Sequence, residues 1–215
     1  MKIETYIFDL DGTLLNTLAD LTKSVNYALS LFEFPQHTEA EICSFIGNGV
    51  EKLIKRAVPK YVEPEITKNV LKMFGDYYKV HCADNSLPYG DIVSVVAKLA
   101  AQGCKIAVVS NKSHEETEIL IRKFFGSSVS FILGSKPNFP KKPEPNMVLA
   151  AISALNANPK TTVYIGDSDV DVKTANNVGI KSVGVSWGFR GREFLAKAQA
   201  DIIVDNPCEL LKIGK

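Results

Sequence analysis

The chain has 215 residues, 46% of them hydrophobic and 23% charged, and its 25 basic and 24 acidic residues leave a formal net charge of +1. This length can bury a full core, either as one large domain or as a domain that carries a smaller insert. The balanced charge excludes a global bias toward nucleic acid or membrane surfaces.

An apolar run at the start of the chain ends abruptly in two acids. We expect residues 2 to 8 to form a buried strand, after which Asp9 and Asp11 lie two residues apart, so that strand geometry can aim both carboxylates at one spot. Gly12 then allows a sharp turn. Neighbouring carboxylates repel each other, and a hard divalent cation such as Mg²⁺ would compensate them best. The alternative is an acidic turn that caps the next helix.

The stretch from about Thr17 to His81 has apolar residues at heptad-like spacing, which predicts helices without strands. Placed directly after the acidic loop, it would emerge at the carboxyl end of the first strand, where open α/β sheets bind ligands. We therefore expect a catalytic core at residues 1–15 and 88–215, and a small helical cap at residues 16–87 that acts as a lid. The alternative is a set of extra helices packed on the side of the sheet.

Strands and helices alternate in the rest of the chain. Further buried strands are expected at residues 105–109, 129–133, 162–165 and 181–185, with a short edge strand at 202–204 and helices at 91–102, 115–125, 146–155 and 169–178. This alternation predicts an α/β fold with a parallel sheet and right-handed crossovers.

The loop after the expected strand at residues 105–109 offers groups for phosphate. Ser110 supplies a hydroxyl and Asn111 a backbone N–H that could both donate to phosphate oxygens. An ordinary turn explains them equally well, and Ser113 with Glu116 fits a capping box that begins the next helix.

A lysine and two further acids complete the set of candidate site residues. Lys142 could offset the charge of a phosphate, although Lys136 and Lys141 compete with it on spacing alone. Asp167 ends a strand, and Asp171 follows four residues later, so both could face one ion. A capping box of Ser168 and Asp171 explains the second acid but leaves Asp167 unexplained.

These residues suggest phosphoryl transfer. A carboxylate can attack phosphorus if it is held in line while a cation and donors neutralise the phosphoryl oxygens. Asp9 is the better-anchored nucleophile, and Asp11 could protonate the leaving oxygen and later deprotonate the attacking water. Neither acidic loop fits a calcium-binding EF-hand, because Leu14 and Val172 stand where glycine is required.

Four motifs in order, DLDGT, Ser-Asn, Lys-Pro and GDSxxD, resemble those of the haloacid dehalogenase-like hydrolase superfamily. The resemblance implies a Rossmann-like core, a helical cap after the first motif and Mg²⁺-dependent phosphatase chemistry. Position by position, it implies that Asp9 is nucleophile and metal ligand, that Asp11 is acid/base and touches the metal through its carbonyl, and that Asp167 is the third metal ligand. It further implies that Asp171 orients the metal site and that the phosphate-binding residues are Thr13, Ser110, Asn111 and Lys142.

Two shorter stretches are similar to the phosphoglycolate phosphatase subgroup. They are residues 46–50 (IGNGV) with Arg56 in the cap, and residues 186–190 (SWGFR) near the end. Asn48 and Arg56 are therefore candidates for cap specificity. Gly-Asn-Gly could also simply begin a helix, and Trp187 could be core or hinge packing.

We therefore expect a Mg²⁺-dependent phosphomonoester hydrolase that acts on a small phosphorylated metabolite, with 2-phosphoglycolate as the leading candidate. We expect a monomer or homodimer that binds neither nucleic acid nor membranes. The alternatives are a phosphosugar mutase, for which His37 and His81 are the cap histidine candidates, and a non-catalytic phosphate-binding regulatory module. The start of the chain lacks a secretory signal, and four scattered cysteines, Cys43, Cys82, Cys104 and Cys208, indicate reduced packing residues. A cytoplasmic location is the expectation.

Overall fold

The computed structural model describes residues 2–47 and 49–214, and it divides the chain into two compact units. One unit comprises Met1–Asn16 and Pro88–Lys215, and the other comprises Thr17–Leu87. We call them the core unit and the cap unit. No helix in the described ranges is both long and apolar enough to span a membrane.

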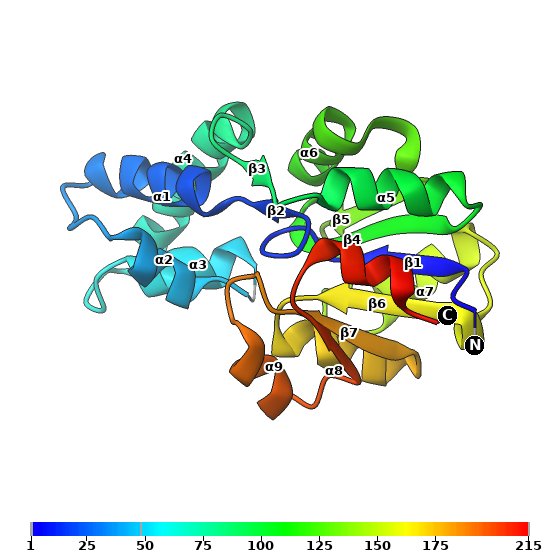
Figure 1. The fold of residues 1–215 in the computed structure, drawn as a ribbon. Helices are drawn as coiled ribbons and strands as arrows, with labels where there is room; N and C mark the ends of the chain where they lie inside the picture. Colours follow the sequence, from blue (N-terminus) through cyan, green and yellow to red (C-terminus); the bar gives the residue numbers. More distant parts are fainter. Residues whose placement is uncertain (1, 48, 215) are drawn as a thin grey trace. The chain divides into compact units, whose positions relative to one another are not determined.

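The core unit is built on a six-stranded parallel sheet in the order β5-β4-β1-β6-β7-β8 (Figure 1). The strands are β1 (Thr5–Phe8), β4 (Lys105–Ser113), β5 (Phe131–Ser135), β6 (Thr162–Gly166), β7 (Lys181–Val185) and β8 (Ile202–Val204). All four residues of β1 are buried, as a central parallel strand with both faces covered requires. The predicted α/β fold with a parallel sheet is confirmed.

Helices cover both faces of this sheet. On one face α5 (Ile92–Ala101) contacts α6 (His114–Phe125), and on the other α7 (Asn146–Ala154) contacts α8 (Asp169–Val178) (Figure 1). The remaining elements are the helix α9 (Arg192–Lys197) and the short 3₁₀ turns η1 (Gly126–Ser128), η2 (Pro159–Thr161) and η3 (Pro207–Lys212). Ile7, Tyr164 and Met147 belong to a buried cluster between the sheet and α7.

The carboxyl ends of β1, β4 and β6 lie next to one another, because β1 pairs with β4 on one side and with β6 on the other. The chain leaves β4 for α6 on one face of the sheet and leaves β6 for α8 on the opposite face. Open parallel sheets bind ligands at such a point, where the crossovers change face.

The strands and helices differ from the prediction mainly at their ends. β4 continues to Ser113 with a register shift after Val109, so Ser110 and Asn111 lie within an irregular strand rather than in a loop. The alternative of a capping box at α6 is not borne out, because the Ser113 side chain makes no cap hydrogen bond. The Ser113 carbonyl accepts from the Thr117 hydroxyl at 2.6 Å. The capping box of Ser168 and Asp171 is present.

The cap unit contains the helices α1 (Leu18–Ser30), α2 (Glu39–Phe45), α3 (Val50–Ala57) and α4 (Pro64–His81). Its described residues from 17 to 81 form no strand, as predicted. α2 begins with a capping box of Thr38 and Glu41, and α4 begins with Pro64 at its first position. β2 (Leu15–Asn16) and β3 (Leu87–Pro88) form a separate two-stranded sheet.

Candidate active site

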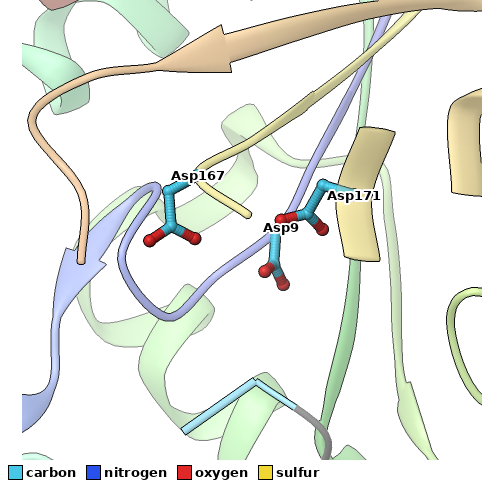
Figure 2. A group of neighbouring side chains, drawn as sticks. All are labelled: Asp9, Asp167 and Asp171. Carbon is cyan, nitrogen blue, oxygen red and sulfur yellow. The ribbon is translucent and has the colours of Figure 1, made fainter. Parts of the chain in front are cut away.

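Three carboxylates meet at the carboxyl edge of the central strands. Asp9 directly follows β1, Asp167 follows β6, and Asp171 lies in the first turn of α8. Each offers an oxygen within 4.8 Å of the other two, and Figure 2 shows Asp9 and Asp171 close together with Asp167 as their neighbour. All three are largely buried, so their charges cannot be screened by bulk water.

Lys142 supplies a positive charge to this cluster. Its Nζ lies 2.8 Å from Asp9 Oδ1 and 2.8 Å from Asp171 Oδ1, and its side chain is only 2% exposed. Burial alone lowers the pKa of Lys142, but Asp171 and Asp9 outweigh that effect and hold the pKa well above its ordinary value. Lys142 therefore remains an ammonium group inside the site.

Two neighbours fix the position of Lys142. The Asn111 side chain donates to the Lys142 carbonyl at 3.0 Å and accepts from its N–H at 2.9 Å. The Tyr164 hydroxyl accepts from Lys142 Nζ at 2.9 Å and donates to the Val109 carbonyl at 3.0 Å. These contacts place Lys142, and neither of its sequence competitors, in the cluster.

Asp171 uses both carboxylate oxygens within the protein. One contacts Lys142, and the other accepts from the Ser168 N–H at 3.1 Å and the Ser168 hydroxyl at 2.6 Å. Asp171 therefore forms the capping box with Ser168 and the contact with Lys142 at the same time. Asp171 is better placed to hold Lys142 and the start of α8 than to coordinate an ion itself.

Asp9 and Asp167 each keep a carboxylate oxygen that accepts no hydrogen bond from any residue in the described part of the chain. The other oxygen of Asp9 faces Lys142, and Asp167 Oδ2 accepts from the Phe189 N–H at 2.7 Å. Three ionised carboxylates and one ammonium sum to a formal charge of −2. Two available oxygens and this charge fit a hard divalent cation.

Burial dominates the electrostatics of these two acids. Desolvation raises the pKa of Asp9 to about 7, with Lys142 lowering it and Asp171 raising it further. Desolvation, together with Asp171 and Asp9, also holds the pKa of Asp167 well above its ordinary value. Protons therefore compete with any cation for these oxygens, and a bound cation would favour the ionised carboxylates.

Two glycines, Gly12 and Gly188, allow the segment after β7 to pack closely against Asp167. Gly12 has a φ of +80°, and a Cβ there would overlap the Asp167 carboxylate. A Cβ on Gly188 would overlap Asp167 and the Gly12 carbonyl. Trp187 Nε1 donates to the Thr13 carbonyl at 3.0 Å. The predicted turn at Gly12 thus also makes room for Asp167, and Trp187 ties residues 186–190 to the DLDGT motif.

Asp11 is not a member of the three-acid cluster and contacts a different lysine. Lys112 Nζ donates to its two carboxylate oxygens at 3.0 and 3.2 Å. Lys112 is 3% exposed in its side chain and Asp11 18%. Asp9 and Asp11, which lie two residues apart in the sequence, therefore contact different lysines, Lys142 and Lys112.

The remaining predicted residues of the core unit are buried beside these groups. The Ser110 hydroxyl accepts from the Lys112 N–H at 3.2 Å, and Ser110 is 2% exposed. Thr13 is fully buried, and its hydroxyl forms no hydrogen bond with the part of the chain that the structure describes. The Thr13 hydroxyl, two residues after Asp11 in the chain, is therefore a group that a bound phosphate or water could satisfy.

The candidates in the cap unit stay predictions. Asn48 lies outside the described residues, and Arg56 Nη1 donates to the Phe45 carbonyl at 2.6 Å. Both cap histidines contact groups of their own unit. His37 Nε2 lies 2.8 Å from the Ala57 carbonyl oxygen, and His81 Nδ1 lies 2.7 Å from Asp84 Oδ2.

Sequence reasoning missed Lys112, Tyr164 and the main-chain N–H of Phe189. A signal existed for the first two, because each places a polar group in or directly after an apolar strand. No residue type could have revealed Phe189, since its contribution is a backbone donor.

Comparison with known proteins identifies the family. Residues 6–185 match the family described as Haloacid dehalogenase-like hydrolase. A phosphoglycolate phosphatase from Pasteurella multocida is 31% identical over 214 residues, which cover 96% of each protein. A pyrophosphatase from Bacillus mycoides is 29% identical over 218 residues, which cover 99% of this chain and 97% of that protein.

The fold agrees with this assignment. The crystal structure of a predicted phosphoglycolate phosphatase from Haemophilus somnus shares 30% sequence identity and a TM-score of 0.93, and the match covers 100% of this chain and 99% of that one. The resemblance inferred from the four motifs is confirmed. The chain belongs to the haloacid dehalogenase-like hydrolase family, and it is an enzyme of the phosphatase group within that family.

Proposed function

We propose that this enzyme is a Mg²⁺-dependent phosphomonoester hydrolase that works through an aspartyl phosphate on Asp9. The observation that carries the proposal is the pairing of Asp9 with Lys142 beside Asp167. The proposed nucleophile, the lysine ammonium group and a second carboxylate lie together there. A divalent cation held by Asp9 and Asp167 would supply positive charge to the phosphoryl oxygens.

The reaction has two balanced steps. In the first, Asp9 forms a bond to phosphorus, the ester P–O bond breaks, and Asp11 gives a proton to the leaving oxygen. In the second, Asp11 takes a proton from a water molecule that attacks phosphorus, and the Asp9 O–P bond breaks to release phosphate. Lys142 neutralises charge on the transferred group, and the Ser110 hydroxyl and Asn111 N–H are the proposed phosphate donors.

The proposed substrate is a small anionic phosphomonoester, with 2-phosphoglycolate first. The name of the Pasteurella multocida relative supports this choice, and the Bacillus mycoides relative makes pyrophosphate the competitor to test. Asn48 and Arg56 remain the proposed specificity residues, and the cap unit is proposed to act as a lid. A panel of phosphorylated metabolites with and without Mg²⁺ ranks these substrates by kcat/KM. Isomerisation of a hexose phosphate without phosphate release would favour a mutase.

The nucleophile is tested by Asp9→Asn. We expect turnover to fall by roughly a thousandfold or more, because an amide cannot attack phosphorus, while the folded structure persists. The matched control is Asp169→Asn, an acid between Asp167 and Asp171 whose carboxylate pairs with Lys173 at 2.6 Å and not with the cluster. Near-normal turnover in the Asp9 variant would refute the proposal, and tight metabolite binding without phosphate release in the wild type would indicate a regulatory module.

A further inference from the structure

Lys112 is a buried cation that neither the four motifs nor the proposed steps employ. It lies near the carboxyl end of β4, and its Nζ donates to both oxygens of Asp11, 101 residues earlier in the chain. Its side chain is 3% exposed. Removing an ammonium group from water is costly, so a buried lysine that faces one acid at the mouth of the site calls for an explanation beyond packing.

The backbone on both sides of this contact is fixed. The Leu10 carbonyl accepts from the N–H groups of Thr13, Leu14 and Leu15, which holds the turn that carries Asp11. The Lys112 N–H donates to the Ser110 hydroxyl at 3.2 Å. With both main chains held, the two contacts to Nζ restrict rotation of the Asp11 carboxylate.

The two lysines of the site divide the acids between them. Lys142 contacts Asp9 and Asp171, whereas Lys112 contacts Asp11. We infer that Lys112 is a positioning residue that holds the Asp11 carboxylate in the orientation needed for proton transfer to and from the reacting oxygens. This inference rests on the proposed function, since it assumes that Asp11 is the proton donor and acceptor.

Positioning of this kind has a consequence that depends on the substrate. An alkoxide leaving group needs a proton as the ester bond breaks, whereas a nitrophenolate leaves readily without one. Loss of Lys112 should therefore slow the cleavage of an alkyl phosphate much more than that of an aryl phosphate. The quantity kcat/KM is the appropriate measure, because it reports the steps up to the departure of the leaving group.

The experiment compares kcat/KM for 2-phosphoglycolate and para-nitrophenyl phosphate in the wild type and in Lys112→Met, a variant of similar length without charge. We expect the ratio of the two values to fall by roughly tenfold or more, in the same direction as in Asp11→Asn. The ratio within one preparation does not depend on the fraction of folded enzyme. Lys112→Gln provides a second variant should the first fold poorly.

The matched control is Lys105→Met, at the other end of β4, where the lysine donates to the Asn156 carbonyl. Its ratio should equal that of the wild type. If Asp11→Asn lowers the ratio but both Lys112 variants leave it unchanged, the inference about Lys112 is overturned and the proposed function stands. If Asp11→Asn itself leaves the ratio unchanged, the proton-transfer role of Asp11 fails, and the role of Lys112 fails with it.

Discussion

Asp167 is the acid whose position depends most on close packing. It accepts a hydrogen bond from the Phe189 main chain, and both Gly12 and Gly188 lie against it with no room for a Cβ. Its location therefore depends on the segment after β7 as much as on the strand that carries it. A small change in that segment should alter the proposed cation site before it alters the fold.

Gly188→Ala tests this dependence. The added methyl group would overlap Asp167 and the Gly12 carbonyl, so we expect the variant to fold but to bind Mg²⁺ roughly tenfold or more weakly. The measurement is the rise in thermal midpoint over a Mg²⁺ titration, which does not require turnover. The control is Gly75→Ala in α4, where a Cβ meets nothing within 4 Å. Equal Mg²⁺ responses in the two variants would show that the Gly188 contact does not position Asp167.

At the scale of single residues, the sequence predicted the acids better than their partners. Asp9 and Asp167 could be found because each directly follows an apolar strand. The role of Asn111 could not, because its side chain binds the main chain of Lys142, 31 residues away. Lys112 was missed for the same reason, since a pattern of residue types does not show which distant acid a lysine meets.

Among the elements, α1 and the end of the cap unit are joined by a buried acid. Asp20 is 1% exposed, and its carboxylate accepts from the N–H groups of Asn85 and Ser86 and from both of their side chains, at 2.7 to 2.9 Å. These contacts tie the first helix of the cap unit to the segment that leaves it, 65 residues later. Burial alone raises the pKa of Asp20, but these hydrogen bonds outweigh it and hold the pKa below its ordinary value.

Asp20→Ala should therefore destabilise the cap unit. We expect a loss of roughly 2–4 kcal/mol in the free energy of unfolding at pH 7, because several buried donors lose their acceptor. The measurement is urea denaturation followed by circular dichroism. The control, Asp76→Ala, removes an acid from an exposed pair with Lys72 in α4 and should cost less than about 1 kcal/mol.

The difference between wild type and Asp20→Ala should also depend on pH. Because the folded-state pKa is lowered, the unfolded chain takes up the proton first, and the stabilisation is fully present above the unfolded pKa of about 4. It should shrink as the pH falls below that value and through the folded-state pKa. A difference that stays constant down to acid pH, or one as small as that of the Asp76 control, would contradict the role of Asp20.

The elements themselves were largely predictable, and their ends were not. Alternating apolar strands and helices identified the order of the core unit, because a parallel sheet needs crossovers of that length. The extension of β4 to Ser113 was missed because it depends on pairing with Ser135 after a register shift. The capping box of Ser113 and Glu116 is absent although its residue types were suitable, because the Ser113 side chain makes no cap hydrogen bond.

In the molecule as a whole, the proposed chemistry belongs to one of the two units, the core unit. All the acids and lysines of the proposed site lie in the core unit, on segments that are far apart in the chain and adjacent in the sheet. The strand pattern could predict this meeting point, because the carboxyl ends of neighbouring parallel strands share an edge. The substrate could not be predicted from the same pattern, because the proposed selection by cap residues would depend on side-chain geometry that spacing does not encode.

The central claim is that the phosphoryl group is transferred first to Asp9 and then to water. The stereochemical course at phosphorus tests this claim most directly. A phosphorothioate ester made chiral with oxygen isotopes would be hydrolysed in isotopically labelled water, and the configuration of the released thiophosphate determined. Two successive in-line displacements, first by Asp9 and then by water, predict net retention of configuration. Net inversion would mean that water displaces the leaving group in one step, and it would contradict the aspartyl phosphate.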